Sequence, residues 1–272
     1  MKTNVFKRII FIVSGLIALS PFVSFGVAQE FNSNSLLTDP SILAYHRLET
    51  DGTSTVGTIG NMSGSGVPTF PAAKFGNGAS SSEASSQYLN VTSNLGVGGG
   101  DFSVCFWYKV GLQPDNAEND YLVFQGNNTS KTEFHIDYIG TAGTHDLNFV
   151  RTRRNVADDT LTTSQDLSAA TFTHLCLTYD DDGAGTITGY VNGASQGTAA
   201  SSGTGSGATT DNFGLAVNLR GTPGEFADGL FDDNVVFSRT LTPGEVSSIY
   251  DTAVAGGGGC NRKLRGVGVS RC

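Results

Sequence analysis

The sequence has little charge and no sustained helical pattern. Only 15% of its 272 residues are charged, whereas 36 are glycine. Beyond the N-terminus no apolar pattern with a helical period persists, but short alternating apolar runs recur along the chain. Glycine favours turns, and alternation of apolar and polar residues is typical of half-buried strands. The sequence therefore predicts few amphipathic helices and an all-β sandwich or barrel.

Basic residues are also scarce. The chain has 16 lysines and arginines against 25 acids, which gives a net charge of −9. Lys2, Lys7 and Arg8 and four basic residues after position 255 account for much of the positive charge, so residues 29–255 carry −16. Nucleic-acid binding needs a basic surface, and this acidic body argues against it. It suits a soluble extracellular domain, and it suits calcium, which prefers oxygen ligands.

Long apolar runs are absent except at the start of the chain. After the basic residues comes the apolar run Ile9–Val27, whose small-residue ending favours cleavage after Ala28. Residues 1–28 are therefore predicted to be a signal peptide, and the protein to be secreted or at the cell surface. The alternative is an uncleaved membrane anchor, which would be the only membrane contact. Serines and a proline within the run weaken it as a spanning helix.

The spacing of the strand signals favours a two-sheet antiparallel jelly roll over residues 29–255. Thr242 and Glu245 form a capping box around Pro243, so one short helix, about Pro243–Thr252, is expected to close the domain. Asn192-Gly193 is typical of a type I′ hairpin turn. The expected strands are Ile42–Leu48, Tyr88–Thr92, Phe102–Val110, Tyr121–Phe124, Phe134–Tyr138, Leu147–Arg151, Thr173–Tyr179, Thr186–Val191, Phe213–Val217 and Phe231–Phe237.

Cysteine is rare, and the chain has only 4. Two of them, Cys260 and Cys272, lie in a glycine-rich basic tail, residues 256–272. There they could pair with each other, pair between chains or stay free. The tail is too short to build a core of its own.

The other two cysteines, Cys105 and Cys176, lie in expected strands. By the two-residue period, Phe102, Val104 and Phe106 share one face of the first strand, and Cys105 lies on the opposite face. The same holds for Cys176 in its strand. If the apolar faces point into the core, both cysteines emerge on the less apolar face, where neighbouring strands are close enough for a bridge. We expect a Cys105–Cys176 disulfide; the alternative is two small buried thiols.

Catalytic motifs are missing as well. No HExxH or CxxC pattern occurs, and no pair of carboxylates has the spacing of a glycoside hydrolase. Gly193–Gly197 matches G-x-S-x-G, but it follows a hairpin turn and opens no helix, unlike a nucleophile elbow. The histidines are scattered over separate strands, where such residues are most often structural. The sequence predicts a protein that is not an enzyme.

The order of the motifs resembles a known family. "ILAYHRLE", "KFGNGASSSEASSQYLNV", "DFSVCFWYKV", "TFTHLCLTYDDDGAGTITGYVNG" and "GLFDDNVVFSRTLTPGEVSSIY" together are similar to laminin G-like (LamG) domains of the concanavalin A-like lectin/glucanase superfamily, over about residues 36–252. The cysteine pair resembles that of pentraxins, where a disulfide joins these two places. The resemblance implies a jelly roll that recognises glycans or extracellular proteins, often with calcium. Relatives also include hydrolases and lyases.

Two adjacent acids, Asp232 and Asp233, begin the last expected strand. The resemblance implies that an acid there can meet an acid near the first strand around calcium. We expect Asp232 to pair with Glu49, with the Gly60 carbonyl or Asn61 helping and Asp233 pointing the opposite way. The alternative is that one acid caps a turn and the other is solvated.

Trp107 and His174 share the strand face of the two cysteines. If that face is concave, Trp107 could stack on a sugar ring with His174 beside it; the alternative is packing beneath a loop. The function expected is an exported, non-enzymatic module that binds carbohydrate or a cell-surface or extracellular protein, possibly with calcium. The alternatives are a structural or adhesive surface component tethered by its tail, and a polysaccharide hydrolase or lyase with an unrecognised site.

Overall fold

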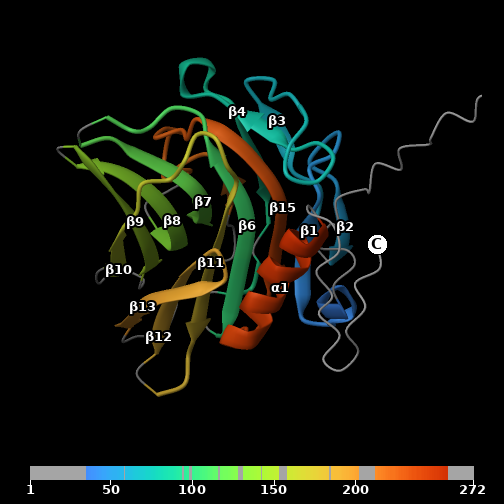
Figure 1. Cartoon of the computed structure of the whole chain (residues 1–272), viewed down its shortest axis with the longest axis vertical. Helices are drawn as coiled ribbons and strands as arrows, with labels where there is room; N and C mark the ends of the chain where they lie inside the picture. Colours follow the sequence, from blue (N-terminus) through green and yellow to red (C-terminus); the bar gives the residue numbers. More distant parts are fainter. Residues whose placement is uncertain are drawn as a thin grey trace, which may run out of the picture.

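A computed structural model describes residues 35–256, apart from 58, 94, 98–99, 116, 128–130, 142, 153–157, 184 and 202–211. The predicted signal peptide, Cys260 and Cys272 lie outside the described residues. The chain forms two stacked antiparallel sheets and one α-helix (Figure 1), which confirms the expected jelly-roll sandwich. Among the described residues, no helix is both long and apolar enough to cross a bilayer.

The first sheet has eight strands. Their order is β13 (Ala194–Ala200), β12 (Thr186–Val191), β11 (Thr173–Asp180), β6 (Phe102–Val110), β15 (Gly229–Phe237), β1 (Ile42–His46) and β2 (Ser54–Gly57), with β4 (Ala79–Ser81) paired to β15. The second sheet has seven, in the order β10 (Asp158–Ser164), β9 (Thr144–Thr152), β8 (Lys131–Thr141), β7 (Asn119–Asn127), β14 (Asn212–Leu215), β5 (Tyr88–Thr92) and β3 (Ser63–Ser65). Short 3₁₀ turns cover Ser35–Thr38 and Glu83–Ser85, and α1 spans Pro243–Gly256.

Every expected strand overlaps an observed one, and β5, β6 and β12 have the expected bounds. The structure adds β2, β3, β4, β10 and β13, which the sequence did not predict. These strands consist mainly of small and polar residues, as in "DDTLTTS" and "ASQGTAA", so they lack an apolar alternation. The helix continues four residues beyond the expected Thr252, to Gly256.

The main core lies between the two sheets. The face of β6 that carries Phe102, Val104 and Phe106 is fully buried there, as the alternation predicted. Phe102 stacks on Phe134 of the opposite sheet, with 4.6 Å between ring centroids. Aromatic contacts of this kind fix how the two sheets face each other.

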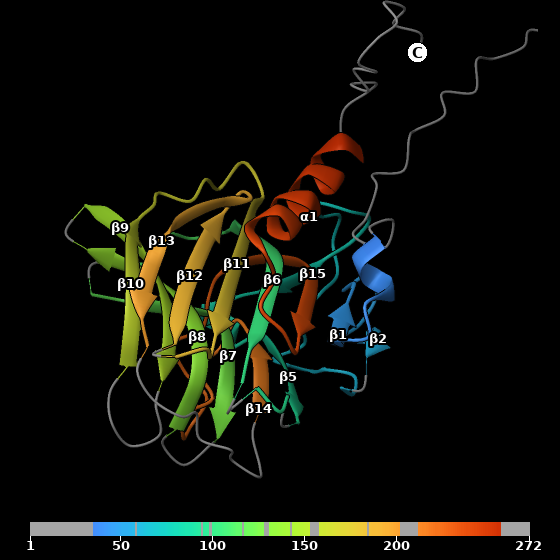
Figure 2. The same cartoon turned by 90° about the horizontal axis from the view of Figure 1, so that it is seen from below.

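A second apolar layer covers the outer face of the eight-stranded sheet. Helix α1 lies over this face (Figures 1 and 2), and its Val246 and Ile249 join one buried cluster with Cys105 and Cys176. The opposite face of β6, expected to be the less apolar one, is therefore buried as well. We call this surface the covered face.

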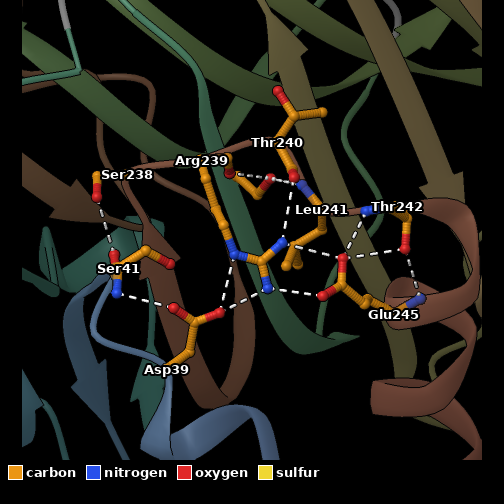
Figure 3. A network of polar contacts seen from close by, with 9 residues as sticks. Asp39, Ser41, Ser238, Arg239, Thr240, Leu241, Thr242 and Glu245 are labelled. Carbon is orange, nitrogen blue, oxygen red and sulfur yellow. Dashed lines mark hydrogen bonds and ion pairs between the residues drawn. The ribbon is translucent and has the colours of Figure 1, made fainter.

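Arg239 fixes the start of α1 (Figure 3). Its Nη2 lies 2.6 Å from Oδ2 of Asp39 and 2.7 Å from Oε1 of Glu245, so one guanidinium ties the N-terminal segment to the helix. The Thr242 amide donates to Glu245 Oε2 (2.8 Å) and the Glu245 amide to Thr242 Oγ1 (3.3 Å), which confirms the capping box. Hydrogen bonds from Arg239 lower the pKa of Glu245 to about 2.

Candidate functional site

Asp232 lies in β15 and is fully buried. Its Oδ2 accepts a hydrogen bond from the Phe75 amide at 2.8 Å, while Oδ1 has no hydrogen-bond partner among the described residues. Burial, and after it the charge of Asp233, raises the pKa of Asp232 to about 9. Oδ1 of Asp232 therefore lacks a hydrogen-bond donor, and burial favours the protonated carboxyl.

The structure brings Glu49 to the same loop that bonds Asp232. Oε2 of Glu49 accepts from the Asn77 amide at 3.0 Å, and the Asn77 side-chain amide donates to the Glu49 carbonyl at 3.0 Å. The charge of Glu49 also contributes to the raised pKa of Asp232, so the two acids lie close enough to interact, while their pairing around calcium stays a prediction. The chain segment 74–77 is held by both of them.

The side chains of the other two predicted ligands, Asp233 and Asn61, make hydrogen bonds elsewhere. A β-bulge between Asp232 and Val235 breaks the alternation of β15, so Asp233 does not simply take the opposite face; its Oδ1 accepts from the Tyr45 hydroxyl at 2.7 Å. The side-chain oxygen of Asn61 accepts from the Ser54 amide at 3.0 Å, within an exposed turn.

Calcium takes six to eight oxygen ligands, and no group of three or more His, Cys, Asp or Glu side chains in the described part of the chain could hold a metal ion. Lys74 is a nearby cation: burial lowers its pKa, and the charge of Asp232 offsets part of that lowering. Calcium binding at Glu49, Asn61, Asp232 and Asp233 stays a prediction.

Trp107 and His174 are adjacent, as the parity argument required, but both are buried. They are paired across β6 and β11 with 5.1 Å between ring centroids, and their exposed fractions are 2% and 1%. Tyr250 of α1 stacks on Trp107 at 5.8 Å, and Phe75 packs against its edge. Neither ring presents a face to a ligand because α1 and the loop at residue 75 cover them, so packing explains both.

The predicted disulfide is present. Cys105 and Cys176 are direct partners in the register of β6 and β11, and their sulfurs are bonded. The bridge lies in the apolar cluster beneath α1. It joins two central strands of the covered face and belongs to the scaffold.

The outer face of the seven-stranded sheet differs in composition. On its strands β7 to β10 the outward positions include Tyr121, His135, Asp137, Asn148 and Thr162, which we call the open face. In the sequence the histidines lie on separate expected strands, so this group was not predicted. The alternation of His135 and Asp137 with apolar residues of β8 indicated that these two side chains share a face. Which residues of β7 and β9 lie beside them is known only from the register of the strands.

A chain of polar contacts crosses the open face. Thr162 donates to the side-chain oxygen of Asn148 at 2.7 Å, and a side-chain hydrogen bond joins Asn148 to Asp137. Asp137 Oδ1 lies 3.8 Å from His135 Nε2, too far for a hydrogen bond. Tyr121 stacks on His135 with 4.8 Å between centroids. Thr162 and half-buried Asn148 thus form the solvent-facing end of a buried network.

The inner end of this network is not satisfied. Oδ1 of Asp137 and Nδ1 of His135 have no hydrogen-bond partner among the described residues, and the two side chains are only 3% and 4% exposed. Burial raises the pKa of Asp137 to about 7 and lowers the pKa of His135 to about 3. Near neutral pH the network therefore holds a neutral imidazole beside a carboxyl that readily gains or loses a proton.

Comparison with known proteins agrees with the architecture. A family model described as the concanavalin A-like lectin/glucanases superfamily matches residues 83–247. Comparison with curated protein sequences finds no match.

Solved structures share the fold at low identity. Domain 4 of AbnA, an extracellular GH43 arabinanase from Geobacillus stearothermophilus solved with arabinotriose, has a TM-score of 0.58 and 18% identity, covering 77% of this chain and 98% of its own. The binding domain of botulinum neurotoxin DC in complex with SialylT has a TM-score of 0.60 and 16% identity, and the match covers 79% of this chain and 52% of the toxin chain. The binding domain of Paraclostridial Mosquitocidal Protein 1 has a TM-score of 0.61 and 16% identity, and the match covers 79% of this chain and 53% of the other. The chain spans about half of these toxin chains, and the likeness shows the fold.

Proposed function

The chain belongs to the concanavalin A-like lectin/glucanase superfamily, and on that basis we propose that it is an exported, non-enzymatic module that binds carbohydrate on its open face. The similar structures support a binding role, because one was solved with arabinotriose and one with SialylT. The binding domain of botulinum neurotoxin DC was also solved with rat synaptotagmin II, which makes an extracellular protein the second candidate partner.

One observation carries the proposal. On the open face Asn148 is held between Thr162 and the buried Asp137, and Asp137 still has an unpartnered oxygen. An amide fixed in this way presents a donor and an acceptor in a defined orientation, as sugar hydroxyls require. A buried polar atom without a partner costs free energy. A ligand hydroxyl that reorganises the network could remove that cost.

A glycan array of the purified domain tests the proposal, run with and without a chelator. We expect binding by the native protein, and at least tenfold weaker binding by Asn148→Ala because each lost hydrogen bond to a ligand weakens affinity by about that factor. Asn90→Ala is the matched control, since Asn90 lies on β5 of the same sheet, away from the network. Failure to bind any glycan in either condition would refute carbohydrate recognition.

Two further measurements address the alternatives. Turnover of a polysaccharide that one acid-to-amide change abolishes would show an enzyme instead of a binding module. Disulfide-linked dimers on non-reducing gels, lost when Cys260 and Cys272 are replaced, would favour a tethered structural component. Export is tested by the N-terminus of protein recovered from the culture medium, which we expect at Gln29.

A further inference from the structure

The turn between β1 and β2 lines a second polar site, which is open to solvent. A hollow of about 250 Å³ lies there, at the β2 edge of the eight-stranded sheet. Its lining consists of Arg47, Glu49, Thr50, Asp51, Thr53 and Thr55. None of these residues belongs to the open face, whose network lies on β7 to β10 near the opposite edge of the other sheet.

Glu49 is held in position within this hollow. The Asn77 amide and side chain donate to its carboxylate and to its carbonyl, both at 3.0 Å. Gly76 has a φ of +61°, and a Cβ there would lie 2.5 Å from Glu49 Oε2. Glycine suits this position because its φ is positive, and a side chain there would also have to displace the end of the Glu49 side chain. The hydrogen bonds from Asn77 place the Glu49 carboxylate against this loop.

Arg47 sets a donor beside this acceptor. Its Nη2 lies 3.4 Å from Glu49 Oε1, and both side chains are about a third exposed, at 31% and 30%. An exposed pair of this length contributes little to stability. Asp51 shapes the turn by accepting from the Thr53 amide at 2.8 Å. The hollow is thus lined by a guanidinium, carboxylates and threonine hydroxyls.

This lining selects the class of ligand. Arg47 disfavours a metal cation, Glu49 and Asp51 disfavour an anion, and the polar walls disfavour an apolar molecule. Two adjacent hydroxyls fit, because one can donate to the carboxylate of Glu49 while the other accepts from Arg47. The volume is below the roughly 300–1,000 Å³ of drug-sized pockets, so it suits a single sugar ring.

We propose that the Arg47–Glu49 hollow binds one sugar residue through a pair of neighbouring hydroxyls, as a site independent of the open face. It lacks an aromatic platform, so its affinity for a free monosaccharide is low, in the millimolar range. Two weak sites on one domain allow a polysaccharide to be held by avidity when it can reach both.

The test uses the methyl glycosides of D-galactose, D-mannose and L-arabinose as probes, titrated into the full chain and followed by amide chemical shifts. We expect at least one probe to shift amides within residues 47–55 saturably. Glu49→Gln should weaken that binding about tenfold or more, and Thr50→Phe should abolish it by filling the hollow. Glu83→Gln, an exposed acid elsewhere, is the matched control and should bind normally.

The outcomes separate the two sites. Saturable shifts in residues 47–55 that survive Asn148→Ala support the hollow even if the open face binds nothing. No saturable shift there with any probe overturns the proposal, as does binding that Glu49→Gln and Thr50→Phe leave unchanged. Thr50 is exposed, so Thr50→Phe should stay folded. It can therefore decide the test even if Glu49→Gln loses its structure.

Discussion

The two outer faces of the sandwich show how differently the same strand alternation can be used. On the covered face Trp107 and His174 lie beneath α1, together with the disulfide. On the open face Tyr121 and His135 form a similar ring pair, but next to it lies a polar network that reaches solvent through Asn148 and Thr162. Both aromatic–histidine pairs are buried, the first beneath α1 and the second where Tyr121 packs with Val217 and Leu219. The open face therefore differs from the covered face in its polar network with a solvent-facing end, and not in its ring pair.

The largest expected effect separates stability from binding. Trp107→Ala should lower the free energy of unfolding by about 3–5 kcal/mol, because it leaves a cavity beneath α1, yet the folded protein should bind glycan normally. Thr162→Ala on the open face should change stability by less than about 0.5 kcal/mol and weaken binding. Denaturant unfolding and glycan titration of both variants check this. Loss of binding by folded Trp107→Ala would put the ligand on the covered face.

Removal of the disulfide, which lies on the covered face, should lower the free energy of unfolding by a similar amount. Its cysteines are 71 residues apart, and closing a loop of that length stabilises by about 4 kcal/mol in the chain-entropy model. The double variant Cys105→Ala/Cys176→Ala should lose stability by an amount of that order in denaturant unfolding. Cys272→Ala is the control and should unfold like the native protein. An unchanged midpoint in the double variant would show that the bridge does not act on the scaffold.

A smaller effect is expected where α1 begins. Arg239→Met removes hydrogen bonds to Asp39 and Glu245, and because these groups are partly exposed the loss should be about 1–2 kcal/mol. The lowered pKa of Glu245 makes this contribution present above pH 4.5 and lost as the pH falls toward 2. Thermal unfolding should thus show a smaller difference in melting temperature between variant and native protein at pH 3 than at pH 7. Equal differences would contradict the pairing.

The last prediction concerns the pH dependence of stability on the open face. Burial raises the pKa of Asp137 to about 7, whereas an unfolded aspartate titrates near pH 4. The folded state therefore holds an extra proton between these values, and stability falls as the pH rises from about 4 to about 7. Asp137→Asn should remove this part of the decline between pH 5 and pH 8 in thermal unfolding. Asp182→Asn, an exposed acid in the turn after β11, should not.

Much of the fold could be predicted from the sequence. Apolar alternation located β6, β11 and β15, and the parity of Cys105 and Cys176 placed them opposite each other. β10 and β13 could not be found, because their small and polar residues form strands only through pairing with β9 and β12. The bulge at Asp233 was also invisible, since it arises from the pairing of β15 with β6.

The candidate site could be predicted less well. Parity correctly joined Trp107 to His174, but it could not show that Tyr250 of α1 packs on them, because helix docking is a long-range contact. The network of Asp137, Asn148 and Thr162 joins three strands, and only the register of β8, β9 and β10 brings these residues together. Single-strand patterns do not contain that information.

Hydrogen exchange with and without a bound glycan compares the two faces most directly. With a glycan selected on the array, the amides of β9 and β10 should exchange more slowly, while those of α1 and β11 keep their native rates. Slowing confined to α1 and β11, with β9 and β10 unchanged, would contradict the assignment of ligand binding to the open face.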